Sequence, residues 1–338
     1  MSAPFVELLG NRMKRRDFIG FVGGATAWPL VARAQPTAKV VRIGFLGVSS
    51  PSEWATKVDA LRAGLRDLGY VEDKNIVINF RWAQGQYDRL PLLAQELVAL
   101  NVDVLVTQAT PGVRAAKQAT RTIPIVIAAV GDAVAAGLVE SMSRPGSNIT
   151  GSSFFVPELA SKRLGLLKEA FTHVKHVGIL LNPIGIARTA AWQDAMAAAA
   201  KSLALELQEF PVKGPHELEG AFALMADKGI DAVGVNEDPV LVGNARAIVD
   251  IVARQRLPAI GFLEFGEAGG LMAYGASIVE MHRRAAFFVD KILKGIKPSD
   301  LPVEQPTKFH FSINLKAAKS LGLTIPPALL VRADEVIE

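Results

Sequence analysis

Two periods of hydrophobic positions alternate along this chain, and together they predict strands joined by helices. Short continuous apolar runs are typical of strands buried in a parallel sheet. Apolar residues three or four positions apart are typical of a helix with one buried face. From residue 40 onward the runs predict strands over 40–47, 75–82, 102–107 and 123–130. The helical spacing predicts helices between them, over 53–68, 90–100 and 111–120.

The same pattern starts again near residue 174 and predicts a second lobe. Apolar runs predict strands over 176–181, 205–210, 230–235 and 257–263. Helical spacing predicts helices over 189–203, 217–228 and 244–254. We therefore expect an α/β protein with two doubly wound parallel-sheet lobes joined by a hinge, because strands that alternate with helices build parallel sheets covered on both faces.

The lobe boundaries are expected where the repeating pattern pauses. The first lobe is predicted over residues 40–148 and the second over 152–275. The stretch 146–151 lies between them and is expected to be one hinge crossing, with another around Gly275. Residues 276–338 are too few to fold alone, so we expect this segment to cross back and complete the lobes. It is predicted to contain a helix over 278–293 and a strand followed by a helix within 309–323.

The first 34 residues differ in composition from the rest of the chain. They carry five basic and two acidic side chains, and so account for +3 of the formal net charge of +4. A basic cluster precedes an apolar stretch and then Ala32-Arg33-Ala34, which is the layout of a signal peptide. We expect residues 1–34 to be that peptide, with its core at 13–34 and cleavage after Ala34. Arg15-Arg16 is similar to a twin-arginine export signal, and a general secretory signal or an uncleaved anchor are the alternatives.

Composition and motifs exclude several classes of protein. With 50% hydrophobic and 21% charged residues the chain is not disordered. The absence of cysteine removes disulfides, thiolate metal sites, a two-cysteine racemase mechanism and a lipoprotein anchor. Beyond residue 34 the net charge is only +1 and no helix-turn-helix pattern is present, so nucleic-acid binding is not favoured. The five histidines are scattered, and no dinucleotide, Walker or nucleophile-elbow motif occurs, so neither a cofactor nor an enzyme is expected.

Candidate binding residues follow from the two-lobed geometry. In open parallel sheets a ligand lies beyond the carboxyl ends of the strands, where helices begin. Hydroxyl and amide groups there suit a carboxylate, acidic groups suit an ammonium group, and aromatic rings supply an apolar wall. The predicted ligand-binding residues are Ser49, Ser50, Gln108, Thr110, Asp132, Phe154, Asn182, Asn236, Asp238, Phe265 and Tyr274.

Some of these residues also suit a purely structural role. Ser50, Thr110 and Asn182 are equally well placed to cap helices. Asp238-Pro239 is typical of a turn or of a helix start. Trp82 and Tyr87 are expected to pack and to shape the loop that follows the second strand. Further residues at comparable positions are Trp54, Glu237 and Glu264.

Several longer motifs carry a resemblance to a known family. They are KRRDFI at 14–19, RWAQGQYDRLP at 81–91, RPGSNITG at 144–151, AGGLMAYG at 268–275, LPVEQPTKF at 301–309, INLK at 313–316 and RADEVIE at 332–338. From Met13 onward the chain resembles the substrate-binding proteins of ABC transporters, in the bacterial family related to tryptophan- and tyrosine-binding transport proteins.

The resemblance implies a periplasmic protein of the type I periplasmic-binding-protein-like fold. We expect the mature protein to be a monomer without stable membrane insertion. Such a protein closes on a small solute, here an aromatic or other amino acid, and delivers it to an ABC permease and its ATPase. One departure concerns the site: the family commonly has Gly-Asp-Pro after the fourth strand, where this chain has Gly131-Asp132-Ala133. Alanine leaves that loop freer than proline does. A ligand sensor that controls a partner protein and an enzyme on the same scaffold are the alternative functions.

Overall fold

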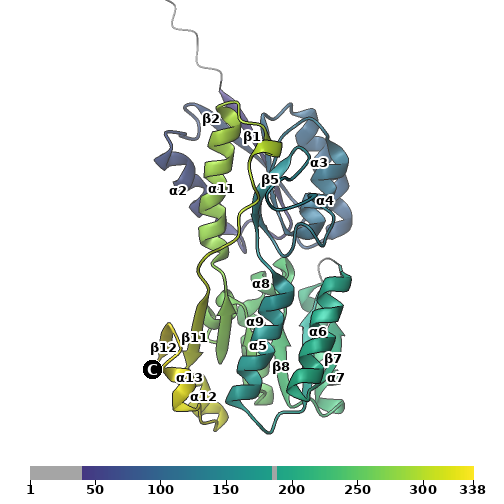
Figure 1. Cartoon of the computed structure of the whole chain (residues 1–338), viewed down its shortest axis with the longest axis vertical. Helices are drawn as coiled ribbons and strands as arrows, with labels where there is room; N and C mark the ends of the chain where they lie inside the picture. The colour runs from purple at the N-terminus through teal and green to yellow at the C-terminus, as the bar shows by residue number, and fades with distance from the viewer. Residues whose placement is uncertain (1–39, 185–188) are drawn as a thin grey trace, which may run out of the picture. The chain divides into compact units, whose positions relative to one another are not determined.

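Each of the two predicted lobes is built on one sheet (Figure 1). The computed structural model describes residues 40–184 and 189–338. The predicted signal peptide over residues 1–34 lies outside the described residues. Of the described helices, none combines the length and the apolar composition that crossing a membrane requires.

The sheet of the first lobe contains five parallel strands in the order β2-β1-β3-β4-β5. The strands are β1 (Val41–Gly47), β2 (Ile76–Trp82), β3 (Val104–Gln108), β4 (Ile125–Val130) and β5 (Ile149–Ser153). Helices α2 (Ala55–Asp67), α3 (Leu90–Ala99) and α4 (Ala109–Ala119) and the short 3-10 helix η1 (Tyr87–Arg89) connect them. Every residue of β3 and β4 is buried, because helices cover both faces of the sheet.

The sheet of the second lobe has seven strands in the order β12-β11-β10-β9-β8-β6-β7, and only β10 and β11 pair antiparallel. Its strands are β6 (His176–Leu181), β7 (Glu206–Pro211), β8 (Ala232–Val235), β9 (Ala259–Gly261), β10 (Met272–Gly275), β11 (His310–Asn314) and β12 (Glu335–Ile337). Its helices are α5 (Val156–Ala170), α6 (Ala190–Leu203), α7 (Leu218–Asp227), α8 (Pro239–Gly243), α9 (Ala245–Gln255), α10 (Leu263–Glu267), α12 (Leu315–Leu321) and α13 (Pro327–Leu330), with the 3-10 turn η3 (Pro215–Glu217).

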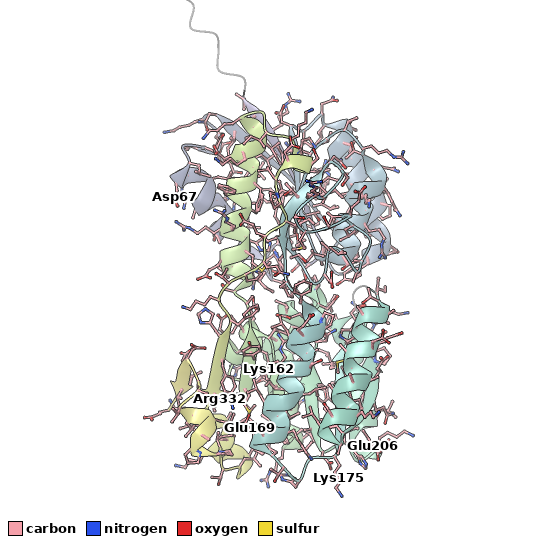
Figure 2. The ribbon with its side chains drawn as sticks, viewed as in Figure 1. Asp67, Lys162, Glu169, Lys175, Glu206 and Arg332 are labelled. Carbon is pink, nitrogen blue, oxygen red and sulfur yellow. The ribbon has the colours of Figure 1, made fainter. Side chains whose placement is uncertain are left out.

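The C-terminal quarter of the chain contributes to both lobes. Helix α11 (Ile278–Leu293) follows β10 in the second lobe but packs against α2 and β4 of the first lobe (Figure 1). The chain then passes η4 (Pro298–Asp300) and returns to the second sheet as β11. There Arg332 pairs with Glu169 of α5, with 2.6 Å between Nη1 and Oε1 (Figure 2).

The α/β class and the two doubly wound lobes are confirmed, but β5 and α5 differ from the expectation. The stretch 146–151, expected as a hinge crossing, runs into β5, and the chain leaves the first sheet only after Ser153. Strand β5 has a single large apolar residue, Ile149, so hydropathy alone does not reveal it. Gly151 has a φ of +133°, and a Cβ there would overlap the backbone of Ile127 in the neighbouring strand.

Helix α5 is also unexpected, and one predicted strand is shorter than expected. Pro157 and Gly165 interrupt the apolar pattern of α5, although proline is tolerated in the first helical turn. The strand predicted over 257–263 ends at Gly261, because α10 begins at Leu263. Both differences leave the strand order of the second sheet intact.

Candidate functional site

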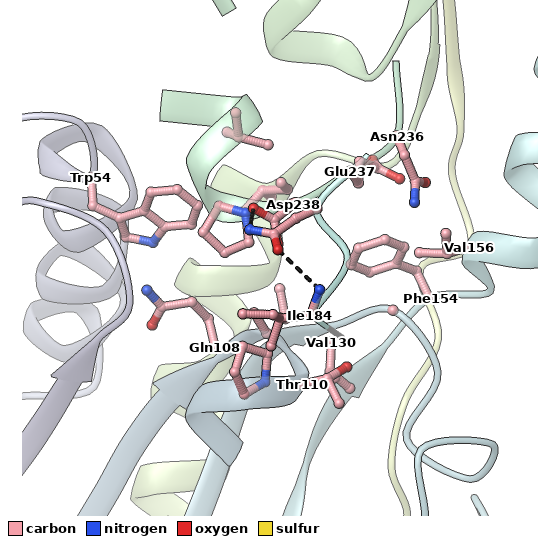
Figure 3. A pocket seen from close by; sticks show the side chains of 18 residues that line it. Trp54, Gln108, Thr110, Val130, Phe154, Val156, Ile184, Asn236, Glu237 and Asp238 are labelled. Atoms are coloured by element: carbon pink, nitrogen blue, oxygen red, sulfur yellow. Dashed lines mark hydrogen bonds between the residues drawn. The ribbon is translucent and has the colours of Figure 1, made fainter. Parts of the chain in front are cut away.

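A cavity lies where the carboxyl ends of strands from both lobes meet (Figure 3). It encloses about 600 Å³ of atom-free space, including its opening to solvent. The ends of β3 and β4 line it from the first lobe, and the segments after β6 and β8 line it from the second. The cavity is therefore where the sheet geometry predicts a ligand.

The apolar wall of the cavity includes Trp54 and Phe154, which lie on different sides of it in Figure 3. Trp54 is held in place from behind, because its Nε1 donates to Nε2 of His282 at 3.1 Å. Nδ1 of His282 in turn donates to the carbonyl oxygen of Ile278 at 2.8 Å. These two bonds require the neutral imidazole with its proton on Nδ1.

Two amide side chains in the cavity have polar atoms that find no partner among the described residues. For Gln108 these atoms are both Nε2 and Oε1, and for Asn236 the atom is Oδ1. Both side chains are buried, with exposed fractions of 1% and 6%. A buried polar atom without a hydrogen bond costs about 1–3 kcal/mol, so such atoms call for an explanation. A polar ligand in the cavity would satisfy them.

Helix α4 begins at the cavity directly after Gln108. Ala109, Thr110 and Pro111 line the cavity, and Ala109 has a left-handed φ of 57°. That conformation costs about 1–2 kcal/mol for a residue other than glycine. The first N–H groups of a helix lack partners within it and attract negative charge. Together with the unpaired amide of Gln108, this edge of the cavity suits an anionic group.

Asp238 lies at the opposite lobe and receives a dense set of hydrogen bonds. Its Oδ1 accepts from the backbone N of Val240 at 2.9 Å, which caps α8, and from Nδ2 of Asn182 at 3.1 Å (dashed in Figure 3). Tyr87 OH donates to both carboxylate oxygens, at 2.8 and 2.9 Å. Burial raises the pKa of Asp238 to about 6, and the donated hydrogen bonds oppose this rise.

Glu237 lines the cavity beside Asp238 and is neutralised by Arg163 of α5. The atoms Nη2 of Arg163 and Oε2 of Glu237 are 3.0 Å apart, and each side chain is 3% exposed. Burial raises the pKa of Glu237, and the neighbouring guanidinium opposes this effect. Nε of Arg163 also donates to the carbonyl oxygen of Tyr274 at 2.7 Å, so the ion pair ties the cavity to the end of β10.

We expect the stability of this protein to fall in acid through His282. Burial lowers the pKa of His282 from 6.5 to about 4. The unfolded chain therefore takes up this proton near pH 6.5, whereas the folded chain takes it up only near pH 4. The contribution of His282 to stability is complete above pH 6.5 and is lost as the pH falls toward 4. At about 1.4 kcal/mol per pH unit, the loss is on the order of 3 kcal/mol.

Urea denaturation between pH 4 and 7 measures this loss. The wild type should lose more unfolding free energy over that range than His282→Gln, which has no group that titrates there. The two proteins share all other titrating groups, so their difference isolates His282. If the unfolding free energies of the two proteins fall equally between pH 7 and pH 4, protonation of His282 does not cause the loss of stability.

Part of the predicted set comes together at the cavity. The residues that line it are Gln108, Thr110, Phe154, Asn182, Asn236 and Asp238. The structural role expected for Asp238 is also present, since it caps α8. Asn182 has a similar double role, because its Oδ1 accepts from the backbone N of Ile184 at 3.0 Å. For all of these residues, contact with a ligand stays a prediction.

Three predicted residues near the same edge do not line the cavity. Ser49 Oγ donates to the carbonyl oxygen of Pro239 at 3.1 Å, across the lobes. Ser50 and Glu53 accept hydrogen bonds from each other's backbone N–H groups in the turn before α2. Asp132 Oδ1 accepts from the backbone N of the two residues at positions 134 and 135, at 3.1 and 2.9 Å. Its carboxylate is therefore used in closing its own turn.

Two predicted aromatic residues also lie away from the cavity. Phe265 is fully buried and packs edge to face on Phe262, with ring centroids 6.5 Å apart. Tyr274 stacks on Phe309, with centroids 6.1 Å apart. Both rings thus belong to the packing of the second lobe, Phe265 from α10 and Tyr274 from β10.

Several apolar residues that line the cavity are not among those predicted from the sequence. Val130 is the last residue of β4 and could have been predicted by the rule that selected Gln108. Val156 and Ile278 enter from the two segments where the chain crosses between lobes, so their contact with the cavity depends on tertiary structure.

As for metals, residues 40–184 and 189–338 contain no group of three or more His, Asp or Glu side chains that could hold an ion.

This chain is similar to known proteins over most of its length. Residues 45–337 match the model of a family described as ABC transporter substrate binding protein. A tyrosine-binding protein from Clostridioides difficile is 28% identical over 292 residues, which are 85% of this chain and 83% of that protein.

Two solved structures extend the comparison. The ABC domain in complex with L-Trp from Streptococcus pneumonia has a TM-score of 0.78 at 27% identity and covers 88% of this chain and 99% of its own. The ligand-free, open structure of a substrate binding protein with adhesive properties from Clostridium difficile has a TM-score of 0.62 at 26% identity, with the same coverage of both chains.

Proposed function

This chain belongs to the family of ABC transporter substrate binding proteins, and on this premise we propose that it binds an aromatic amino acid between its lobes and delivers it to a membrane permease. One observation carries the proposed solute class. A single cavity combines an apolar wall with buried amide atoms that lack partners. An aromatic amino acid offers a ring for the wall and charged groups for the amides.

The charged groups of the solute are assigned to opposite lobes. The amide of Gln108 and the start of α4 favour the carboxylate, because they offer donors and the positive end of a helix dipole. Oδ1 of Asn236 and the carboxylate of Asp238 favour the ammonium group, because they are acceptors in the second lobe, where Arg163 already pairs with the neighbouring Glu237. The ring then lies between Trp54 and Phe154.

A solute held by both lobes favours their closed arrangement, because it contacts both of them only when they are closed. The TM-scores support closure in the present structure. At nearly equal identity and coverage, the score is 0.78 against the relative that holds L-Trp and 0.62 against the open, ligand-free one. The name of the tyrosine-binding relative supports the same solute class.

The last part of the proposal is the delivery of the bound solute to a membrane permease. We assign the protein to the periplasm, with residues 1–34 as the export signal, and we expect an ABC permease and its ATPase as partners. Uptake of a radiolabelled aromatic amino acid by cells with and without this gene tests the step. Loss of uptake on deletion supports delivery, and unchanged uptake would favour a sensing role.

The solute class is tested by calorimetric titration of the purified full chain. We expect L-tryptophan or L-tyrosine to bind at one molecule per chain. Tryptamine, which lacks the carboxylate, and 3-indolepropionate, which lacks the ammonium group, should bind at least about tenfold more weakly, since each leaves buried polar atoms unpaired. L-leucine has the same charged groups but no aromatic ring, so it is the control for the contribution of the ring. Equal binding of the analogues, or no binding of either aromatic amino acid, would refute the proposal.

A further inference from the structure

Tyr87 does not line the cavity, yet it reaches across the lobes to a residue that does. It lies in η1 of the first lobe, and its hydroxyl donates to both oxygens of Asp238, which is 151 residues away in the second lobe. Both residues are only 9% exposed. The other partners of Asp238, Asn182 and Val240, belong to the second lobe, so Tyr87 supplies the bond that crosses.

The segment that carries Tyr87 is held firmly within the first lobe. The backbone N of Ala83 donates to the carbonyl oxygen of Gly47 at 2.9 Å, and that of Gly85 donates to Val48 at 2.9 Å. From the same lobe, Ser49 Oγ donates a hydrogen bond to the carbonyl oxygen of Pro239, the residue after Asp238. The first lobe therefore offers a preformed surface on which the start of α8 rests. A third contact between the lobes is the buried pair of Lys57 Nζ and Glu264 Oε1, 3.5 Å apart.

We propose that Tyr87 is a positioning residue for the solute: it holds the carboxylate of Asp238 at the cavity and fastens the closed lobes together without touching the solute. The hydrogen bond is available only when the lobes meet, so it stabilises the closed state alone. By population shift, its loss raises the share of the open state and so weakens binding. This inference rests on the proposed function, because Asp238 matters to the solute only if the cavity binds one.

In the hydrogen bond between Tyr87 and Asp238, the hydroxyl of Tyr87 is always the donor and the carboxylate of Asp238 the acceptor. Burial, followed by the charge of Asp238, raises the pKa of Tyr87 well above its usual value of 10. The hydroxyl therefore remains a proton donor under all ordinary conditions. A hydrogen bond to a charged acceptor is roughly twice as strong as a neutral one, so this contact is well suited to hold two lobes.

The chain offers a matched control for this contact. Tyr70 also donates from its hydroxyl to a carboxylate, Oδ1 of Asp290, at 3.1 Å. Asp290 lies on α11, which packs on the first lobe, so this bond stays within one lobe. Tyr70→Phe and Tyr87→Phe remove the same atom and the same kind of bond. They differ in whether the bond joins the lobes.

The test is stopped-flow kinetics of L-tryptophan or L-tyrosine binding to full-chain variants. Tyr87→Phe should raise the dissociation rate about tenfold and leave the association rate within about twofold, because the bond forms after encounter. Tyr70→Phe should change neither rate. Asp238→Asn should weaken binding, and the double variant with Tyr87→Phe should weaken it little further. An unchanged dissociation rate in Tyr87→Phe, an equal rise in Tyr70→Phe, or additive effects would overturn the proposal.

A second measurement separates this inference from the proposed solute. The chain has no cysteine, so Arg121→Cys in the first lobe and Lys213→Cys in the second give a unique pair of exposed sites for fluorophores. Single-molecule energy transfer then reports the closed fraction. Tyr87→Phe should lower this fraction even without solute, and Tyr70→Phe should not. If no aromatic amino acid binds but this shift occurs, the solute assignment fails and the role of Tyr87 in closure stands. If the fraction is unchanged, the role of Tyr87 fails.

Discussion

Replacing Arg163 with methionine is expected to lower the free energy of unfolding by about 3–5 kcal/mol. The substitution leaves the carboxyl of Glu237, which is 3% exposed, without its partner at 3.0 Å. It also removes the donor that reaches the carbonyl oxygen of Tyr274 at 2.7 Å. A buried charge without a partner is costly, so this loss should exceed that of any exposed ion pair in the described chain. Urea denaturation at pH 7 measures it.

An exposed pair provides the control for Arg163→Met. Arg254 and Glu219 are 62% and 69% exposed, so Arg254→Met should cost less than about 1 kcal/mol. The double variant Arg163→Met with Glu237→Leu should regain most of the lost stability, because it buries no unpaired charge. The account of this ion pair is wrong if Arg163→Met costs no more than Arg254→Met.

Gln108→Met should make the unliganded protein more stable while it weakens solute binding. Methionine is close to glutamine in size, and it removes the polar atoms Nε2 and Oε1 that have no partner among the described residues. The expected gain is about 1–3 kcal/mol of unfolding free energy. Affinity for the aromatic amino acid should fall by about 10- to 100-fold, because the solute carboxylate loses a donor. Such opposite changes are typical of a binding residue and not of a packing residue.

Thermal unfolding and calorimetry of the same preparations measure both effects of Gln108→Met. Gln118 lies on α4, the helix that follows Gln108, and is exposed, so Gln118→Met should change neither stability nor affinity. If Gln108→Met destabilises the unliganded protein, its amide has a structural role that the contacts do not reveal. If the affinity is unchanged, Gln108 does not bind the solute.

The sequence predicts the fold and the edge of the sheets at which the cavity lies. Parallel strands end at a common edge, so a residue that ends a strand, such as Gln108, or directly follows one, such as Asn236, can be placed there from the hydropathy pattern alone. The same rule fails for Asp132, because the backbone N–H groups two and three residues later occupy its carboxylate. Hydropathy fixes the position of a residue relative to its strand, and it does not fix where a loop then turns its side chain.

The contacts that organise the site are less predictable because their partners are distant in the chain. Arg163 and Tyr274 are 111 residues apart, and Trp54 and His282 are 228 apart. No local propensity encodes such pairs. Tyr87 illustrates the limit: its sequence setting indicates a loop-packing residue, and only the approach of the second lobe gives its hydroxyl a partner. Which atoms lack partners is likewise known only when the cavity is formed.

A crystal structure of the protein grown with L-tryptophan or L-tyrosine, whichever binds more tightly, would show whether the cavity holds the solute. We expect one amino acid in the cavity between the lobes, with its ring beside Trp54 and Phe154 and a polar atom within hydrogen-bond distance of Gln108. An empty cavity would contradict the account, as would an amino acid bound only at the surface groove that Arg114 and Lys117 line in the first lobe.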